Sequence, residues 1–351
     1  MCRETGVQRL LIRKLPPTMA DGTRRRTAWF LSLCACGLFL RVPDASAQSV
    51  GAISADVDND YFDFFRPPDR RSDDNYTQGI HIGMWFASSP RWLLGSAPSC
   101  GQLVRGETKQ ETCVSSKVVL GQELYTPTND APRPLPGERP YAALLYVDLS
   151  AARMNQKTLH VYGLRLGTTG HAALGDQAQD WFHHLVPQFR TPLGWQHQIA
   201  SEPVIDATYE YHRLVLNARP TPRTGVTLAP SGSLTIGNLL VGAKGAIDVR
   251  AGYRVPHPWA WSEDAVTGAR AYLLGGAQEE LIGYSLLLQG NTSETRGLVT
   301  KRAAVTQWYG GFSAGLSRFS LEFKVVTRSR EYETAPARHV WGTIGMSYGL
   351  H

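Results

Sequence analysis

Apolar and polar residues alternate along this chain in segment after segment, and this alternation constrains the fold more than any other feature. In the first such segment, Ile53, Ala55 and Val57 alternate with Ser54 and Asp56. A period of two is typical of a β-strand with one apolar face and one polar face. The pattern recurs in twelve segments: 49–58, 77–88, 115–127, 141–153, 157–169, 203–218, 225–236, 240–253, 269–285, 303–314, 319–332 and 339–350.

The length and number of these segments favour a membrane barrel. Most have the roughly 9–11 residues that a tilted strand needs to cross a bilayer, and no run of about 18 apolar residues follows residue 47. A closed barrel leaves no open sheet edge in lipid. We therefore predict an all-β fold: a twelve-stranded antiparallel outer-membrane β-barrel with a short helix in an external loop. A soluble secreted β-sandwich or barrel is the alternative.

The N-terminus carries the signals of export. Three arginines at 24–26 precede an apolar run over 28–40, and residues 45–47 read Ala-Ser-Ala, the form of a signal-peptide cleavage site. We predict a signal peptide over 1–47 and, over 48–351, a transmembrane barrel with functional external loops. The predicted location is the bacterial outer membrane.

Charge and cysteine content narrow the partners and the redox setting. Residues 1–47 hold 8 Lys and Arg against 3 Asp and Glu, so the net charge of +6 falls to +1 once they are removed. A nucleic-acid partner is therefore not expected. Cys100 and Cys113 remain after the leader, and in an exported protein we expect them to form a disulfide.

The connections between the segments place the candidate functional loops. If the first strand runs outward, the external connections are 59–76, 128–140, 170–202, 237–239, 286–302 and 333–338. Long loops in a compact fold are typical of function. The cysteine-bearing connection, 89–114, then falls on the periplasmic side.

The third external connection contains an amphipathic stretch, 176–185. At helical spacing, Leu174, Ala178, Trp181 and Leu185 form an apolar stripe. In the same stretch Gln179 and His183, four residues apart, share a polar face. This predicts a short helix that rests on an apolar surface and presents an amide and an imidazole; a solvated polar face is the simpler alternative.

The first external connection brings oxygen ligands together. By alternation, Asp60 at the end of one strand and Thr77 at the start of the next both point inward at the outer rim, beside Asn59. Carboxylate, amide and hydroxyl oxygens suit Ca²⁺. Turn formation by Asx residues is the alternative.

Seven short motifs, taken in order, resemble a known family. They are Asn59-Asp60-x-Phe62, Tyr76-Thr77-x-Gly79, Tyr125-Thr126-Pro127, Arg139-Pro140-Tyr141-Ala142, Gln179-x-x-x-His183, Gly194-Trp195-x-x-Gln198 with Glu202-Pro203, and Gly290-Asn291-Thr292. Their order, over about residues 54–350, is similar to that of the lipid A deacylase LpxR family. The resemblance implies a twelve-stranded outer-membrane barrel and a Ca²⁺-dependent carboxylic ester hydrolase that removes the 3′-acyloxyacyl group of lipid A.

The resemblance also implies site residues. Asn59, Gln179 and His183 match catalytic positions, and Asp60 and Thr77 are expected to bind the Ca²⁺ ion. An active-site lysine near the third strand is also implied; Gln122-Glu123 stand near that place, and Lys117 is the nearest lysine.

These residue types suit hydrolysis by water. A histidine can act as the general base near neutral pH. A Ca²⁺ ion beside Asp60, helped by the Asn59 or Gln179 amide, can stabilise the oxyanion. We expect a monomer acting on lipopolysaccharide among outer-membrane lipids.

Two other functions remain open. One is a porin-like barrel without activity, although inward side chains such as Glu210, His212, Asp248, Arg250 and Lys324 would fill or bridge a narrow lumen. The other is a phospholipase-like or acyltransferase barrel that acts on glycerophospholipid.

Overall fold

The computed structural model describes residues 50–62, 75–89, 94, 100, 112–128, 135–185, 193–259, 268–291 and 299–350, without the side chains of His183 and Leu185. The chain divides into two compact units, Met1–Ser46 and Ala47–His351, and all described residues belong to the second. The signal peptide predicted over 1–47 therefore lies outside the described residues.

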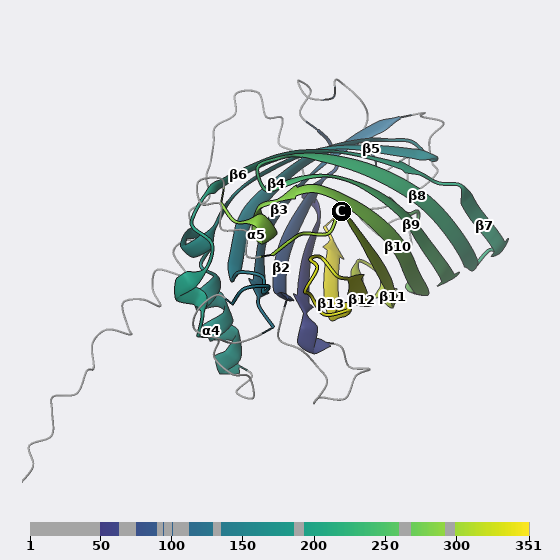
Figure 1. The fold of residues 1–351 in the computed structure, drawn as a ribbon. Coiled ribbons are helices and arrows are strands. Elements are labelled where there is room, and N and C mark those ends of the chain that lie inside the picture. Colours follow the sequence, from purple (N-terminus) through teal and green to yellow (C-terminus); the bar gives the residue numbers. More distant parts are fainter. Residues whose placement is uncertain are drawn as a thin grey trace, which may run out of the picture. The chain divides into compact units, whose positions relative to one another are not determined.

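Thirteen antiparallel strands form one sheet in the described chain, and twelve of them, all except β7, close into a barrel. The strands are β1 (Val50–Asn59), β2 (Asn75–Phe86), β3 (Cys113–Thr126), β4 (Ala142–Met154), β5 (Thr158–Thr169), β6 (Pro203–Arg213), β7 (Leu216–Thr221), β8 (Thr224–Gly237), β9 (Leu240–Tyr253), β10 (Ala269–Ser285), β11 (Ala304–Leu316), β12 (Phe319–Ser329) and β13 (Arg338–Gly349). Strands that are neighbours along the chain pair with each other, except that β6 pairs with β8 and not with β7, and β13 pairs with β1 (Figure 1). The predicted fold class is confirmed.

Strand β7 is one more strand than the sequence predicts. The segment 203–218 was interpreted as a single strand, but β6 ends at Arg213 and β7 begins at Leu216. The last part of β8 pairs with β6, whereas its first part pairs with β7. Between β6 and β7, the backbone N–H of Leu214 donates to the carbonyl of Lys157, and that of Val215 donates to the carbonyl of Leu228. The chain therefore changes its hydrogen-bonding partner at these two residues.

Each barrel strand presents apolar side chains on its outer face. One exposed large apolar residue from each of the twelve strands illustrates this: Ile53, Ile82, Leu120, Leu149, Leu164, Ile205, Leu234, Ile247, Leu273, Phe312, Leu321 and Met346. A continuous apolar outer surface is what a bilayer requires of a barrel. In the described chain, no helix is both long enough and apolar enough to cross a membrane.

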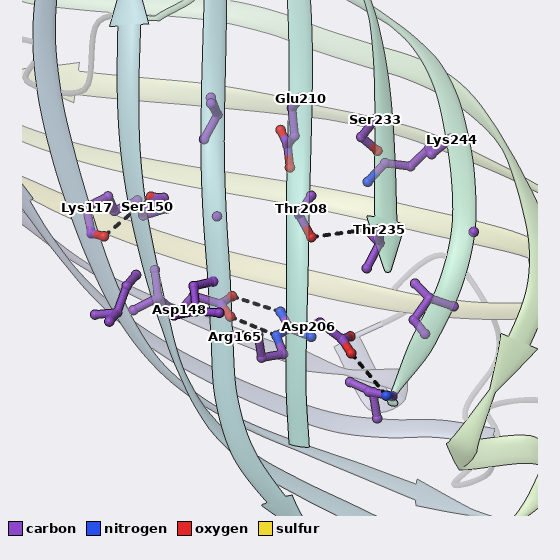
Figure 2. A pocket seen from close by; sticks show the side chains of 18 of the residues that line it. Lys117, Asp148, Ser150, Arg165, Asp206, Thr208, Glu210, Ser233, Thr235 and Lys244 are labelled. Atoms are coloured by element: carbon purple, nitrogen blue, oxygen red, sulfur yellow. Dashed lines mark hydrogen bonds and ion pairs between the residues drawn. The ribbon is translucent and has the colours of Figure 1, made fainter. Parts of the chain in front are cut away.

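The inner faces of the strands are polar and enclose two cavities. The first, about 500 Å³, is lined by residues of β3 to β6 and β8 to β10 (Figure 2). In it, Arg165 donates two hydrogen bonds of 2.8 Å to the carboxylate of Asp148. The second, about 480 Å³, is lined by residues of β1, β2 and β9 to β13. The inward residues named above line these cavities, so they do not fill the lumen completely.

Short helices gather at the end of the barrel where β1 and β5 finish, which is the end predicted to be external. They are η1 (Asp60–Phe62) after β1, and η3 (Gly170–Ala173), α4 (Gly175–Leu185) and η4 (Trp195–His197) between β5 and β6. Another, α5 (Leu286–Gln289), follows β10. Figure 1 shows α4 beside the barrel wall at this end. The predicted loop helix is confirmed, and it begins one residue earlier than the stretch 176–185.

The connection between β2 and β3 carries the predicted disulfide. Cys100 and Cys113 are bonded, and both are buried against Met154 and Trp259. This connection lies at the end opposite to α4, because β2 runs away from η1 and β3 runs back. The predicted pairing of the cysteines is confirmed.

Candidate active site

Helix α4 packs on the outer wall of the barrel. It contacts β3 and β4, and an apolar cluster holds it there: Leu124, Tyr141, Ala143, Ala173 and Trp195, with Ala178 packed against them. Leu124 is on the outer face of β3, because its neighbour Glu123 faces the lumen, where it accepts hydrogen bonds from Tyr125 and Tyr146. The helix therefore lies on the lipid-facing side.

Gln179 is buried between α4 and this wall. Its side chain is 1% exposed, and its Oε1 accepts a hydrogen bond of 2.6 Å from the indole Nε1 of Trp195. Its Nε2 is buried and has no hydrogen-bond partner among the described residues. One turn earlier, an Oδ1 atom of Asp176 is also buried without such a partner. The sequence predicted Gln179 on a polar face away from the apolar one; the structure instead covers it with Trp195.

The two neighbouring histidines of α4 are described to different extents. His183 is one helical turn after Gln179, but its side chain lies outside the described residues. The His184 side chain is 76% exposed, with Nδ1 at 2.7 Å from the carbonyl oxygen of Asp180 and 3.6 Å from its carboxylate. His184 therefore faces solvent, and Trp181, predicted in the apolar stripe, is exposed as well.

Asn59, Asp60 and Thr77 meet at the rim, and all three are buried. Asn59 ends β1, pairs with Gln78, and accepts a hydrogen bond of 2.9 Å from the backbone N–H of Tyr61. Asp60 opens η1, which packs on β13 and β2. Asp60 follows Asn59 along the chain, and Thr77 precedes Gln78 in β2. Because the two strands are antiparallel, Asp60 and Thr77 are neighbours at this end.

A hydrogen bond joins this rim group to the wall beneath α4. The hydroxyl groups of Thr77 and Thr126 are 2.7 Å apart, and Thr126 is two residues from Leu124 of the apolar cluster. The alternation of side chains along β2 predicted that Thr77 points inward. A register shift between Tyr76 and Gln78 interrupts this alternation. Tyr76 faces the lumen at this point and donates to the carboxylate of Asp58.

The ligand types at the rim fit an oxygen-preferring cation. In the described residues, no group of three or more His, Cys, Asp and Glu side chains is close enough to hold a metal. Asp60 supplies one buried carboxylate, while the hydroxyl of Thr77 and nearby backbone carbonyls supply neutral oxygens. Such a set suits Ca²⁺ rather than a nitrogen- or sulfur-preferring metal, but one carboxylate makes a weak site.

No lysine of the described third strand lies beside α4. Lys117 is in the lumen, where its Nζ lies 4.3 Å from the ring centroid of Trp85 and lines the first cavity. Gln122 occupies the outer face of β3, and its Nε2 donates a 2.7 Å hydrogen bond to the carbonyl of Ala173, just before α4. The family's active-site lysine was expected near Gln122 and Glu123 or at Lys117. The position of β3 that contacts the chain just before α4 is Gln122, and Lys117 lies in the lumen.

A nucleophilic serine has no support from the fold. The sequence was expected to lack a Gly-x-Ser-x-Gly motif, but residues 311–315 have this spacing. This segment lies within β11, whereas a nucleophile elbow requires a sharp turn from a strand into a helix. Ser313 is buried in the sheet.

Side chains from distant loops fix the loop that carries α4. Asn291 accepts a hydrogen bond of 2.6 Å from the backbone N–H of Ala200. Its Nδ2 donates to the carbonyl of Ala200 at 2.9 Å and to the carboxylate of Glu202 at 3.0 Å. The motifs around 198–203 and 290–292 therefore join the loop after η4 to the loop after α5.

An ion pair between Arg139 and Glu331 joins the loop before β4 to the loop after β12. Arg139 donates a 3.0 Å hydrogen bond to Glu331, and Arg328 lies 3.3 Å from the same carboxylate. Burial alone would raise the pKa of Glu331, but the Arg328 and Arg139 guanidiniums outweigh it and hold this pKa below its ordinary value. Glu331 is therefore an ionised anchor beside the rim.

Fold and site together define a class of protein. It is a membrane-spanning β-barrel with a buried polar side chain, Gln179, between its outer wall and a loop helix. The family described as "Outer membrane protein LpxR" matches residues 31–350, and the chain belongs to this family. The protein is therefore an outer-membrane protein.

One solved structure with a TM-score above 0.5 has the same fold. LpxR from Salmonella typhimurium is 17% identical, with a TM-score of 0.67, over 85% of this chain and 99% of that chain. The β domain of the Bordetella autotransporter BrkA is 11% identical, with a TM-score of 0.43, over 85% of this chain and 98% of that chain. Comparison with curated protein sequences gives no match.

Proposed function

We propose that this protein is an ester hydrolase that removes the 3′-linked acyloxyacyl chain of lipid A. The observation that carries the proposal is the position of Gln179, a buried amide on the lipid-facing side of the wall whose Nε2 has no partner among the described residues. Lipopolysaccharide fills the outer leaflet around this end of the barrel. Membership of the LpxR family and the ordered motifs of the chain support the same substrate.

The residues of the site would divide the work as follows. His183, one turn after Gln179 on α4, would take a proton from the attacking water. The amide of Gln179 would donate to an oxygen of the ester, where negative charge develops. Asn59, whose Oδ1 is already used by Tyr61, has its amide N–H₂ group left to donate.

Asp60 and Thr77 would hold a Ca²⁺ ion at the rim. When bound, the ion would supply positive charge that stabilises an oxyanion. Asp60 is the buried carboxylate of this group and Thr77 a buried hydroxyl. Since these two residues lie on neighbouring strands, the barrel wall itself sets their spacing.

The two alternatives predict different sites of action. A porin would use the lumen, whereas the buried amide of Gln179 lies on the opposite face of the wall. A phospholipase-like enzyme would use the same wall site on a glycerophospholipid. The barrel also closes within one chain, so we propose that a monomer is sufficient for activity.

Purified protein in detergent, incubated with lipid A or with glycerophospholipid, tests the proposal. We expect an acyloxyacyl chain to be released from lipid A and no fatty acid from the phospholipid. Mass spectrometry of both lipid fractions identifies the chain that leaves. Release of fatty acid from the phospholipid alone would reject lipid A as the substrate in favour of the phospholipase-like alternative.

A further inference from the structure

The orientation of the Gln179 amide is set by a neighbour that can act only as a donor. The two ends of a glutamine amide look alike, so they are assigned from their hydrogen bonds. An indole N–H donates and cannot accept, and the Nε1 of Trp195 lies 2.6 Å from Gln179. The amide oxygen must therefore face Trp195, which leaves the N–H₂ group to point elsewhere.

Trp195 is itself held firmly in place. Its side chain is 7% exposed, and its ring centroid is 5.2 Å from that of Tyr141. A Cβ atom at Gly175 would collide with the Trp195 ring and with Ala143, and one at Gly194 would collide with the Tyr141 ring. The two glycines thus allow the helix and the loop to close around the indole.

The Nε2 group of Gln179 is costly to bury unless a ligand uses it. A buried donor without a partner has lost its hydrogen bonds to water and gained none in return, which destabilises the folded protein. None of the described residues accepts from this group. A group kept at such a cost on the lipid-facing wall is suited to an acceptor oxygen of the substrate, and the developing oxyanion of an ester is the strongest acceptor of this kind.

We propose that Trp195 is a positioning residue for catalysis: it fixes the Gln179 amide so that the N–H₂ group, and not the oxygen, faces the ester of the substrate. This inference rests on the proposed function. Trp195 acts through Gln179 and does not touch the reacting atoms. Without the indole N–H, the amide would turn freely and present its oxygen to the oxyanion part of the time.

The variant Trp195→Phe removes the N–H group and retains an aromatic ring. We expect its kcat on lipid A to fall by about 10-fold or more, but by no more than the roughly 10²–10³-fold that loss of the donor itself would cause. KM should change little, because the amide acts mainly in the transition state. Trp308→Phe, on the lipid-facing side of β11, is the matched control and should keep wild-type kcat.

A double variant separates positioning from a purely structural role. In the Gln179→Ala background, Trp195→Phe should cause no further loss of kcat, because the amide that it orients is gone. If the two losses multiply, or if Trp195→Phe alone retains wild-type kcat, the positioning role is wrong. If the wild-type protein releases no acyl chain from lipid A, the proposed function fails first and the inference fails with it.

The variant Gln179→Glu tests which end of the amide works. An ionised carboxylate can accept from Trp195 but has no hydrogen to donate. Activity should be lost at neutral and alkaline pH and recover as the pH falls, since burial favours the protonated acid, whose O–H group can donate. Full activity at alkaline pH would show that the oxygen faces the ester, which would overturn the proposal. This variant leaves the Trp195 indole in place, so it remains informative if Trp195→Phe does not fold.

Discussion

His183 and His184 are adjacent on α4, but their side chains leave the helix about 100° apart. His184 is exposed and interacts with Asp180 one turn earlier. His183 is one turn after the buried Gln179, on the same side of the helix. The four-residue spacing from Gln179 is why we propose His183, and not the exposed His184, as the base.

The first prediction compares these two residues. His183→Ala should lower deacylation by about 10²–10⁴-fold, the usual loss for a general base. His184→Ala should be nearly silent. Rates of acyl release in membranes, normalised to the amount of folded barrel, measure both. A larger loss at His184 than at His183 would show that the two directions have been assigned wrongly.

Some features of the site follow from sequence and others do not. Asn59, Asp60 and Thr77 could be grouped from strand order, because neighbouring strands bring the ends of a connection together. The burial of Gln179 could not be predicted, since Trp195, sixteen positions further on, covers it only when the loop folds back. The place of Gln122 under η3 likewise depends on which face of β3 meets α4.

Among the elements of the external end, the loop after β12 has two arginine to glutamate pairs that differ in burial. Arg139 is buried and Glu331 is only 16% exposed, whereas Arg302 and Glu333 are 44% and 57% exposed. Removing one partner of a buried pair leaves an uncompensated charge, but an exposed pair is hydrated and screened by salt. Comparing the loss of stability when each pair is removed therefore shows which pair holds these loops in place.

The second prediction concerns these pairs. Arg139→Ala should lower the free energy of unfolding by about 3 kcal/mol, near the lower end for a buried pair because Arg328 still contacts Glu331. Arg302→Ala should cost at most about 1 kcal/mol. Denaturant unfolding in detergent measures both variants. Equal decreases in the free energy of unfolding would show that the pair of Arg139 and Glu331 does not stabilise the loops more than the exposed pair.

The third prediction is the pH dependence of the pair of Arg139 and Glu331. The pKa of Glu331 in the folded protein is below its ordinary value of 4.5. Its stabilising effect is therefore complete above about pH 4.5 and is lost as the pH falls through the lower, folded value. The difference in unfolding free energy between wild type and Glu331→Gln should be constant near neutral pH and shrink in acid. A difference that grows in acid would contradict this sign.

At the level of elements, the alternation predicted strands well and their ends less well. A strand in a barrel wall needs period two, so each of the twelve segments contains a strand. The separation of β7 from β6 was not predicted, although Arg213 on the apolar face and Leu214 on the polar face break the alternation there. The break follows from the change of pairing partner along β8.

The described part of the chain forms a barrel whose wall has two faces with different roles. The lumen holds ion pairs and cavities, while the outer wall near α4 holds the proposed site. The barrel closes through backbone hydrogen bonds between its strands. A cation bound at Asp60 and Thr77 would take no part in these bonds. Loss of that cation should therefore affect catalysis but not the fold.

The fourth prediction follows from this separation. Excess chelator should abolish deacylation, and added Ca²⁺ should restore it. The barrel should keep its folded electrophoretic mobility and its β-sheet circular dichroism throughout, because the strand ladder closes without the ion. Full activity in excess chelator would exclude a role for the cation.

We propose that this barrel removes the 3′-acyloxyacyl chain from lipid A in its own membrane. Mass spectrometry of lipid A, isolated from cells that produce wild-type protein, the His183→Ala variant or neither, is the measurement that tests this activity. We expect wild type to shift lipid A to a mass lower by one acyloxyacyl unit, and the variant to match cells without the protein. Identical lipid A in all three, with folded barrel present in the outer membrane, would contradict the claim.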